Sequence, residues 1–361
     1  MKKLLSFLLI LVLILGTVAC GATEEAISSE GNSAELPTDT DTDTEISAST
    51  EEKEWEPLKV MDDKVLVSDY RNKKIIVYDL SLVGDDGDLN GAEVWVLENA
   101  YSASVKYRED TVYGDVILHT ANYDASIVDY NTKQVVWEAP GVAGWGVHSI
   151  EILPSGNIVT AGATDGILRM FNAANCVFKG DEMTYEDYPG LPSAHGVLWD
   201  PEYECLWALG GNELVAYEVI DNEDGTQSLR KINGMGAKLP AGGQGGHDLA
   251  ADLQDSRYLW ITSSKVLRFD KEEGTFTERY PNSSKLNKGN VKGFGNNLNG
   301  NFIYTQAKAE DQNWVNAGKE SYATDTIVFG FWKSESLFYL KKCVCEGAEF
   351  YKARVFYGKY Q

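Results

Sequence analysis

The chain has 361 residues, with 32 Lys and Arg against 55 Asp and Glu, and a formal net charge of −23 at pH 7. Nucleic acid is excluded as a partner, because no basic footprint exists that could neutralise phosphates. Five cysteines in a chain of this length form no dense disulfide framework.

Residues 1–19 predict a lipoprotein signal peptide. A basic start at Lys2 and Lys3 is followed by an unbroken apolar run and then by small residues before Cys20. The ending resembles a bacterial lipoprotein box, in which Cys20 would carry lipid, although Thr17 stands where that box usually has Leu. An uncleaved N-terminal anchor helix is the alternative. Either way, we expect the remainder to be held at the cell membrane, on the extracytoplasmic face.

Residues 20–54 predict a disordered acidic linker. After Cys20 this stretch consists mainly of acidic residues, Ser and Thr, with no aromatic residue and few apolar ones. Such a composition cannot bury enough surface to offset the entropy of ordering. We therefore expect a flexible, self-repelling tether.

Residues 55–361 contain a repeated unit. Six segments share a strand, a polar turn and a second strand that ends in an aromatic residue. The segments start at Val65, Val116, Ile158, Leu206, Leu259 and Phe302, and their closing aromatics are Tyr78, Tyr130, Phe171, Tyr217, Phe269 and Phe329. The spacing of these aromatics, from 41 residues (Tyr130 to Phe171) to 60 residues (Phe269 to Phe329), fits one four-stranded blade per unit.

Six such units predict an all-β domain, a six-bladed β-propeller. Radial repetition also protects the sheet edges that a long all-β chain would otherwise expose. A pair of β-sandwiches is the alternative, but it does not explain six copies of one unit. The strand-like C-terminal stretch is expected to close the ring against the segment near Trp55.

Three of the four histidines occupy one position of the repeat. His148, His195 and His247 precede the starts of their segments by 10, 11 and 12 residues, and Lys292 precedes Phe302 by 10. Each opens the strand before the hairpin, which in a propeller is the innermost strand and faces the central channel. The sequence therefore predicts that these four side chains meet at one axial space.

Several roles fit this set of side chains. The imidazoles could fill space near the channel, or share a divalent metal, since neutral His is a common ligand. Against a metal stands Lys292, whose charge would repel a cation. In the interpretation we favour, the set binds an anionic group of a ligand, with Lys106 adding charge from the matching position of the second unit. Trp145 could offer a stacking face for a sugar ring, or pack between blades.

Other candidates are weaker. His119 lies inside a hairpin strand and is expected to be a core or interblade residue. Asp86, Asp88 and Asn90 match the start of a calcium-binding loop, but Leu97 stands where the loop needs Glu, and β-turns also favour these residue types. The default for the Cys343 and Cys345 pair is a structural thiol pair.

Two resemblances follow from these motifs. The stretch "HSIEILPSGNIVTAG" resembles the His-led strand of arylsulfotransferase-type propellers, over one blade. From Trp55 to Gln361 the chain is more similar to a family of bacterial six-bladed propellers of unknown function. The features that carry this resemblance are the repeated channel histidines, the "VKG" opening of the last blade, the "TDTIVF" strand and the "GAEFYKARVF" ending. The resemblance implies the fold and no activity.

We thus expect a lipid-anchored propeller that binds an anionic or carbohydrate ligand at the channel mouth. The alternatives are a lyase or hydrolase acting on acidic carbohydrate, with one histidine as general base and the others neutralising charge or holding a metal, and a scaffold for protein partners. The scaffold alternative predicts that replacing all three channel histidines leaves function intact.

Overall fold

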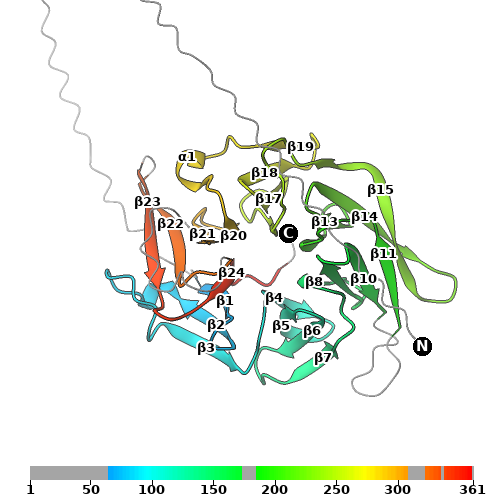
Figure 1. Cartoon of the computed structure of the whole chain (residues 1–361), viewed down its shortest axis with the longest axis horizontal. Coiled ribbons are helices and arrows are strands. Elements are labelled where there is room, and N and C mark those ends of the chain that lie inside the picture. The colour runs from blue at the N-terminus through cyan, green and yellow to red at the C-terminus, as the bar shows by residue number, and fades with distance from the viewer. Residues whose placement is uncertain (1–63, 173–183, 308–321, 335–336, 360–361) are drawn as a thin grey trace, which may run out of the picture. The chain divides into compact units, whose positions relative to one another are not determined.

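The computed structural model describes residues 64–172, 184–307, 322–334 and 337–359. Within these ranges it forms six four-stranded antiparallel sheets, arranged as blades in a ring (Figure 1). The predicted six-bladed β-propeller is confirmed, and the alternative pair of β-sandwiches is wrong, because the strands belong to six separate small sheets. The expected signal peptide, Cys20, the acidic linker and Trp55 lie outside the described residues. In the part of the chain that is described, no helix is both long and apolar enough to cross a membrane.

Each blade runs from an innermost strand at the axis to a fourth strand at the rim. The innermost strands are β24 (Phe350–Val355), β4 (Ser104–Thr111), β8 (Val147–Ile152), β12 (Gly196–Asp200), β16 (Asp248–Ala251) and β20 (Val291–Asn296). The second strands are β1 (Lys64–Asp69), β5 (Gly114–Ala121), β9 (Ile158–Gly162), β13 (Cys205–Leu209), β17 (Tyr258–Thr262) and β21 (Phe302–Gln306).

The third strands are β2 (Lys74–Asp79), β6 (Asp124–Asp129), β10 (Ile167–Phe171), β14 (Glu213–Asp221), β18 (Val266–Asp270) and β22 (Thr326–Ser334). The fourth strands are β3 (Glu93–Glu98), β7 (Val135–Ala139), β11 (Tyr185–Pro189), β15 (Gln227–Lys238), β19 (Thr275–Thr277) and β23 (Leu337–Val344). The short helical turns are η1 (Leu80–Leu82) and α1 (Ser283–Leu286). The segments recognised in the sequence are the second and third strands of each blade.

The C-terminal strand closes the ring. β24 pairs antiparallel with β1, with Val355 opposite Val65 and Ala353 opposite Val67. β24 thereby becomes the innermost strand of the first blade and lies between β20 and β4 (Figure 1). The expectation that the end of the chain closes the ring is confirmed, and its described partner is β1.

The apolar core is divided into six layers, one between each pair of neighbouring blades. The aromatic residues that end the six sequence segments all lie in these layers. Between two of the blades, for example, Trp207 packs edge-on against Phe269 with ring centroids 5.6 Å apart. Each fully buried apolar side chain of this size contributes about 1.5–3 kcal/mol, which is why the repeat keeps an aromatic residue at this position.

The innermost strands approach one another closely at the axis. A Cβ added to Gly293 on β20 would lie 2.9 Å from backbone atoms of Ala353 on β24. A Cβ on Gly196 of β12 would lie 2.6 Å from the Cβ of Leu249 on β16. Glycine is therefore required at these positions. In this propeller arrangement the innermost strands begin at one mouth of the channel and end at the other.

Candidate functional site

The three channel histidines lie side by side. The ring centroids of His148 and His195 are 4.4 Å apart, and those of His195 and His247 are 5.4 Å apart. His148 is the second residue of β8, and the other two immediately precede β12 and β16. Three successive blades thus bring their imidazoles together, as the repeat spacing predicts. We call His148, His195, His247 and Lys292 the histidine mouth.

Lys292 completes this group from the next blade. It is the second residue of β20, and its Nζ lies 3.0 Å from Nε2 of His247. Because an ammonium group only donates hydrogen bonds, His247 must accept through Nε2 and carry its proton on Nδ1. Nδ1 of His247 is buried and makes no hydrogen bond with the described residues. A buried unpaired donor is costly, and such atoms often mark functional sites.

The other two imidazoles have the opposite tautomer. Nδ1 of His148 lies 2.6 Å from the carbonyl oxygen of Gly146, and Nδ1 of His195 lies 2.8 Å from that of Ser193. A carbonyl oxygen only accepts, so in both rings Nδ1 carries the proton and Nε2 carries the lone pair. The mouth therefore offers two imidazole acceptors beside one ammonium donor.

The imidazoles are neutral at physiological pH. Burial, together with the positive charges of Lys352 and Lys292, lowers the pKa of His148 to about 4 and that of His247 to about 3. The pKa of His195 is also well below its usual value, because the ring is buried beside His148 and Lys352. The positive charge that we expected of the histidines thus comes from lysines, and the imidazoles supply hydrogen-bonding groups.

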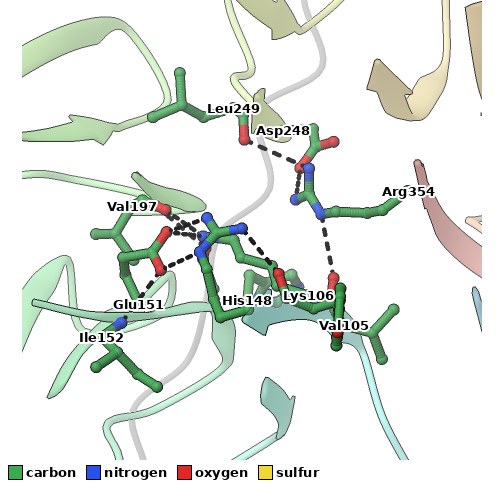
Figure 2. Close-up of polar contacts among 12 residues, drawn as sticks. Val105, Lys106, His148, Glu151, Ile152, Val197, Asp248, Leu249 and Arg354 are labelled. Atoms are coloured by element: carbon green, nitrogen blue, oxygen red, sulfur yellow. Dashed lines mark hydrogen bonds and ion pairs between the residues drawn. The ribbon is translucent and has the colours of Figure 1, made fainter. Parts of the chain in front are cut away.

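A buried cation from the closing strand lies beneath the histidines. Nζ of Lys352 donates to the carbonyl oxygens of His148 (3.2 Å) and His195 (3.4 Å) and lies 3.4 Å from a carboxylate oxygen of Asp248. Asp248 also pairs with Arg354 (Figure 2).

Lys106 does not join the histidine mouth. Its Nζ lies 3.1 Å from Glu151 and donates to the carbonyl oxygen of Val197, further along the channel (Figure 2). Arg108 donates two hydrogen bonds to the same carboxylate, from Nε to Oε1 of Glu151 at 2.9 Å and from Nη2 to Oε2 at 2.7 Å. Glu151 and its two cationic partners are buried. The matching position of the second blade is thus occupied by an ion pair instead of a free lysine.

Aromatic side chains lead from the rim of the same face down to the histidines. Tyr101 packs on Tyr70 at 4.0 Å between ring centroids, and Tyr70 meets Tyr322 at 6.1 Å. Tyr322 meets Tyr351 at 5.8 Å, and Tyr351 lies 5.9 Å from the ring of His148. We call these four tyrosines the tyrosine series. No repeat signal marked them, since they come from three loops and the closing strand.

Trp145 is a surface residue. Its side chain is 54% exposed and stacks on the exposed ring of Tyr123, with centroids 6.2 Å apart. It lies in the loop that enters β8, three residues before His148, on the face where the innermost strands begin. The stacking on Tyr123 joins loops of two neighbouring blades, while the exposed part of the Trp145 ring remains open to solvent, so both expected roles fit its position.

The metal candidates find no support in geometry. Among the described residues, no group of three or more His, Cys, Asp or Glu side chains is placed to hold a metal ion. In the candidate calcium loop, Asp86 and Asp88 accept hydrogen bonds from the backbone N–H groups of Asp88 and Asn90. The residue types of this loop are therefore explained by tight turns.

The remaining candidates have structural surroundings. His119 lies in β5, and burial lowers its pKa to about 4. Cys343 and Cys345 carry free thiols, and burial raises the pKa of both. In the stretch that resembles arylsulfotransferase-type propellers, Gly156 has a φ of +90° and its N–H donates to Leu153 in the turn between β8 and β9. Hairpin geometry thus accounts for that glycine.

Sequence reasoning missed Lys352, Tyr351 and Arg354. All three belong to β24, the C-terminal strand that serves as the innermost strand of the first blade. A comparison of the predicted closing strand with the other innermost strands could have pointed to them, because Tyr351 is the second residue of β24, as His148 is of β8, and Lys352 follows directly.

The fold places the chain among the six-bladed β-propellers. No protein-family model matches the sequence, and no curated protein matches it. The structure is similar to that of a protein of unknown function from Bacteroides caccae, with 14% identity and a TM-score of 0.51, covering 80% of this chain and 97% of that one. A virginiamycin B lyase from Staphylococcus aureus is similar at 13% identity, covering 78% and 81%, with a TM-score of 0.44. At these identities the similarity shows the fold alone.

Proposed function

We propose that this protein binds an anionic carbohydrate, such as a uronic acid oligomer, at the histidine mouth. The observation that carries the proposal is the contact of Lys292 with His247, which ends a row of three adjoining neutral imidazoles. Sugar hydroxyls would donate to Nε2 of His148 and His195, and the ammonium group of Lys292 would pair with the carboxylate. Aromatic side chains beside a few placed polar groups are typical of small-molecule sites.

The aromatic side chains around the mouth support the carbohydrate part of the proposal. The tyrosine series reaches the histidines from one side, and Trp145 stands on the loop that enters β8. The apolar faces of sugar rings pack against such aromatic rings. A simple inorganic anion would gain nothing from them, so their presence favours a sugar acid.

The site is better suited to binding than to catalysis by an imidazole base. A general base works best with a pKa near the operating pH, whereas burial holds the pKa of His148 at about 4 and that of His247 at about 3. A lyase or hydrolase would first have to raise these values. The binding proposal needs only the neutral form.

We further propose that Cys20 is lipidated and that the propeller is displayed on the extracytoplasmic face. The N-terminal residues support this, as they combine a basic start, an apolar run and small residues before a cysteine. A surface-anchored receptor for acidic sugars would fit that location.

The test is a calorimetric titration of the purified full-length protein with trigalacturonate and with its neutral methyl ester. We expect the acid to bind roughly 10- to 100-fold more tightly than the ester, because one charge-assisted hydrogen bond changes affinity by about this factor. Lys292→Gln should abolish that preference, and Lys238→Gln, on an exposed lysine that pairs with Glu213, should keep it. Equal binding of acid and ester, or an unchanged preference in Lys292→Gln, would refute the proposal.

A second variant addresses the imidazoles. Replacing His148, His195 and His247 with Ala together should remove binding of both acid and ester, because the hydroxyl acceptors are lost. Circular dichroism of the variant checks that the propeller is intact. If the folded triple variant binds as the wild type does, the ligand does not use the histidine mouth, and the scaffold alternative gains ground.

A further inference from the structure

The opposite mouth of the channel contains a separate cavity. It is lined by the later parts of the innermost strands and by the segment that follows β24, and it is partly open to solvent. In Figure 1 this C-terminal segment, in red, runs from β24 toward the middle of the ring. We call it the distal cavity, and it shares no lining residue with the histidine mouth.

The lining of the distal cavity is basic. Its charged residues are Lys106, Arg108, Arg354 and Lys359, and no Asp or Glu is among the described residues that line it. This is unusual for a chain whose net charge is −23. Lys106 and Arg108 are buried, and the side chain of Arg354 is only 10% exposed.

Two buried carboxylates near this cavity are each shared by two basic side chains. Glu151 pairs with both Lys106 and Arg108, and Asp248 pairs with both Lys352 and Arg354. Burial lowers the pKa of Lys106 to about 7, and a second carboxylate beside this lysine would stabilise its charged form.

Apart from Asn296, the rest of the lining is apolar or aromatic. Leu249 and Phe294 come from β16 and β20, and Val355 and Tyr357 from the closing strand and its extension. Phe356 holds this extension in place by stacking on Tyr107, with ring centroids 4.1 Å apart. The cavity thus combines basic groups with apolar walls, which suits a ligand with a charged head and an apolar body.

We propose that the distal cavity binds a small organic carboxylate, with its head near Lys106 and Arg354 and its apolar body against Leu249, Phe294 and Val355. This site lies at the other end of the channel from the histidine mouth and does not depend on the function proposed there. Lys359, exposed at the rim, would attract the anion before it enters.

The probes are hexanoate, its neutral analogue hexanamide, and sulfate. We expect hexanoate to raise the Tm of the full-length protein in a concentration-dependent way, because a ligand that binds only the folded state stabilises it. Hexanamide lacks the charge and sulfate lacks the apolar body, so both should give a smaller shift at the same concentration and ionic strength. An equal shift with hexanamide or with sulfate would overturn the proposal.

Two substitutions of Gly295 test whether hexanoate binds in the distal cavity. Gly295 lines the cavity, and a Cβ added there would have only Val355 Cγ2 within 4 Å, at 3.9 Å. Gly295→Leu should fill the cavity and abolish the hexanoate shift, and Gly295→Ala should retain it. If Gly295→Leu does not fold, Lys359→Glu at the rim should reduce the hexanoate affinity about 3- to 10-fold.

Lys292→Gln separates this proposal from the one above. It should lose the preference for acidic sugar and keep the hexanoate shift. If Lys292→Gln removes the hexanoate shift while Gly295→Leu preserves it, the carboxylate binds at the histidine mouth, and the distal site is refuted.

Discussion

Nζ of Lys292 donates a hydrogen bond to Nε2 of His247 across two neighbouring blades, although the residues are 45 positions apart in the sequence. This contact fixes the tautomer of His247 and places a positive charge against a ring that is already buried. Both effects keep the imidazole neutral and leave the ammonium group as the charged element of the histidine mouth.

Removal of the Lys292 charge should therefore raise the pKa of His247. In Lys292→Met we expect the value to rise from about 3 and still stay below the usual 6.5, because burial and Lys352 continue to disfavour protonation. NMR titration of the imidazole C–H resonances measures this. Lys238→Met, which changes an exposed lysine, should leave the resonance unaffected. A pKa of His247 that does not move in Lys292→Met would contradict the assigned contact.

Acid should destabilise the propeller from about pH 6.5 downward. The pKa values of His119 and His148 are lowered to about 4 in the folded state, so between these pH values the unfolded chain binds protons that the folded protein does not. Stability then falls as pH falls, by up to about 1.4 kcal/mol per pH unit for each such histidine. Urea unfolding at several pH values measures the slope. It should be shallower when His148, His195 and His247 are replaced by Ala.

The buried ion pairs should matter far more than exposed ones. Asp248→Asn leaves Lys352 and Arg354 without their carboxylate, and we expect a loss of about 3–5 kcal/mol in unfolding free energy. Glu218→Gln, which breaks the exposed pair with Arg230, should cost about 0–1 kcal/mol. Chemical denaturation compares the two. Similar losses would mean that Asp248 is not part of a buried network.

Because β20 and β24 approach each other closely at the axis, two Gly→Ala substitutions on β20 should differ in their effect on stability. Gly293→Ala places a Cβ 2.9 Å from the backbone of Ala353, and we expect a loss of about 1–3 kcal/mol from overpacking. At Gly295 the nearest atom is 3.9 Å away, so Gly295→Ala should be tolerated. Thermal unfolding of both variants is the measurement, and equal Tm values would show that β20 and β24 are not so close.

The proposed lipid anchor depends on one residue, Cys20. If Cys20 is lipidated, metabolic labelling with an alkyne fatty acid should mark the wild type, and Cys20→Ser should lose the label and leave the membrane fraction. Cys176→Ser serves as the control and should remain labelled. Retention of Cys20→Ser in the membrane without label would favour the uncleaved anchor helix.

Local patterns in the sequence were enough to determine the fold. The alternation of apolar residues and the aromatic at the end of each segment reflect side chains that pack between blades, and this requirement recurs in every unit. For the same reason the innermost strands could be located, and with them His148, His195, His247 and Lys292. These residues lie together because equivalent positions of neighbouring blades must be neighbours.

Only the tertiary structure decided what surrounds them. Lys352 and Tyr351 reach the histidines from the C-terminal strand, and Glu151 neutralises Lys106, through contacts between residues far apart in the chain. The protonation state of the imidazoles was equally beyond the sequence. It depends on burial and on charges brought in by ring closure, and these are properties of the assembled ring that no single repeat encodes.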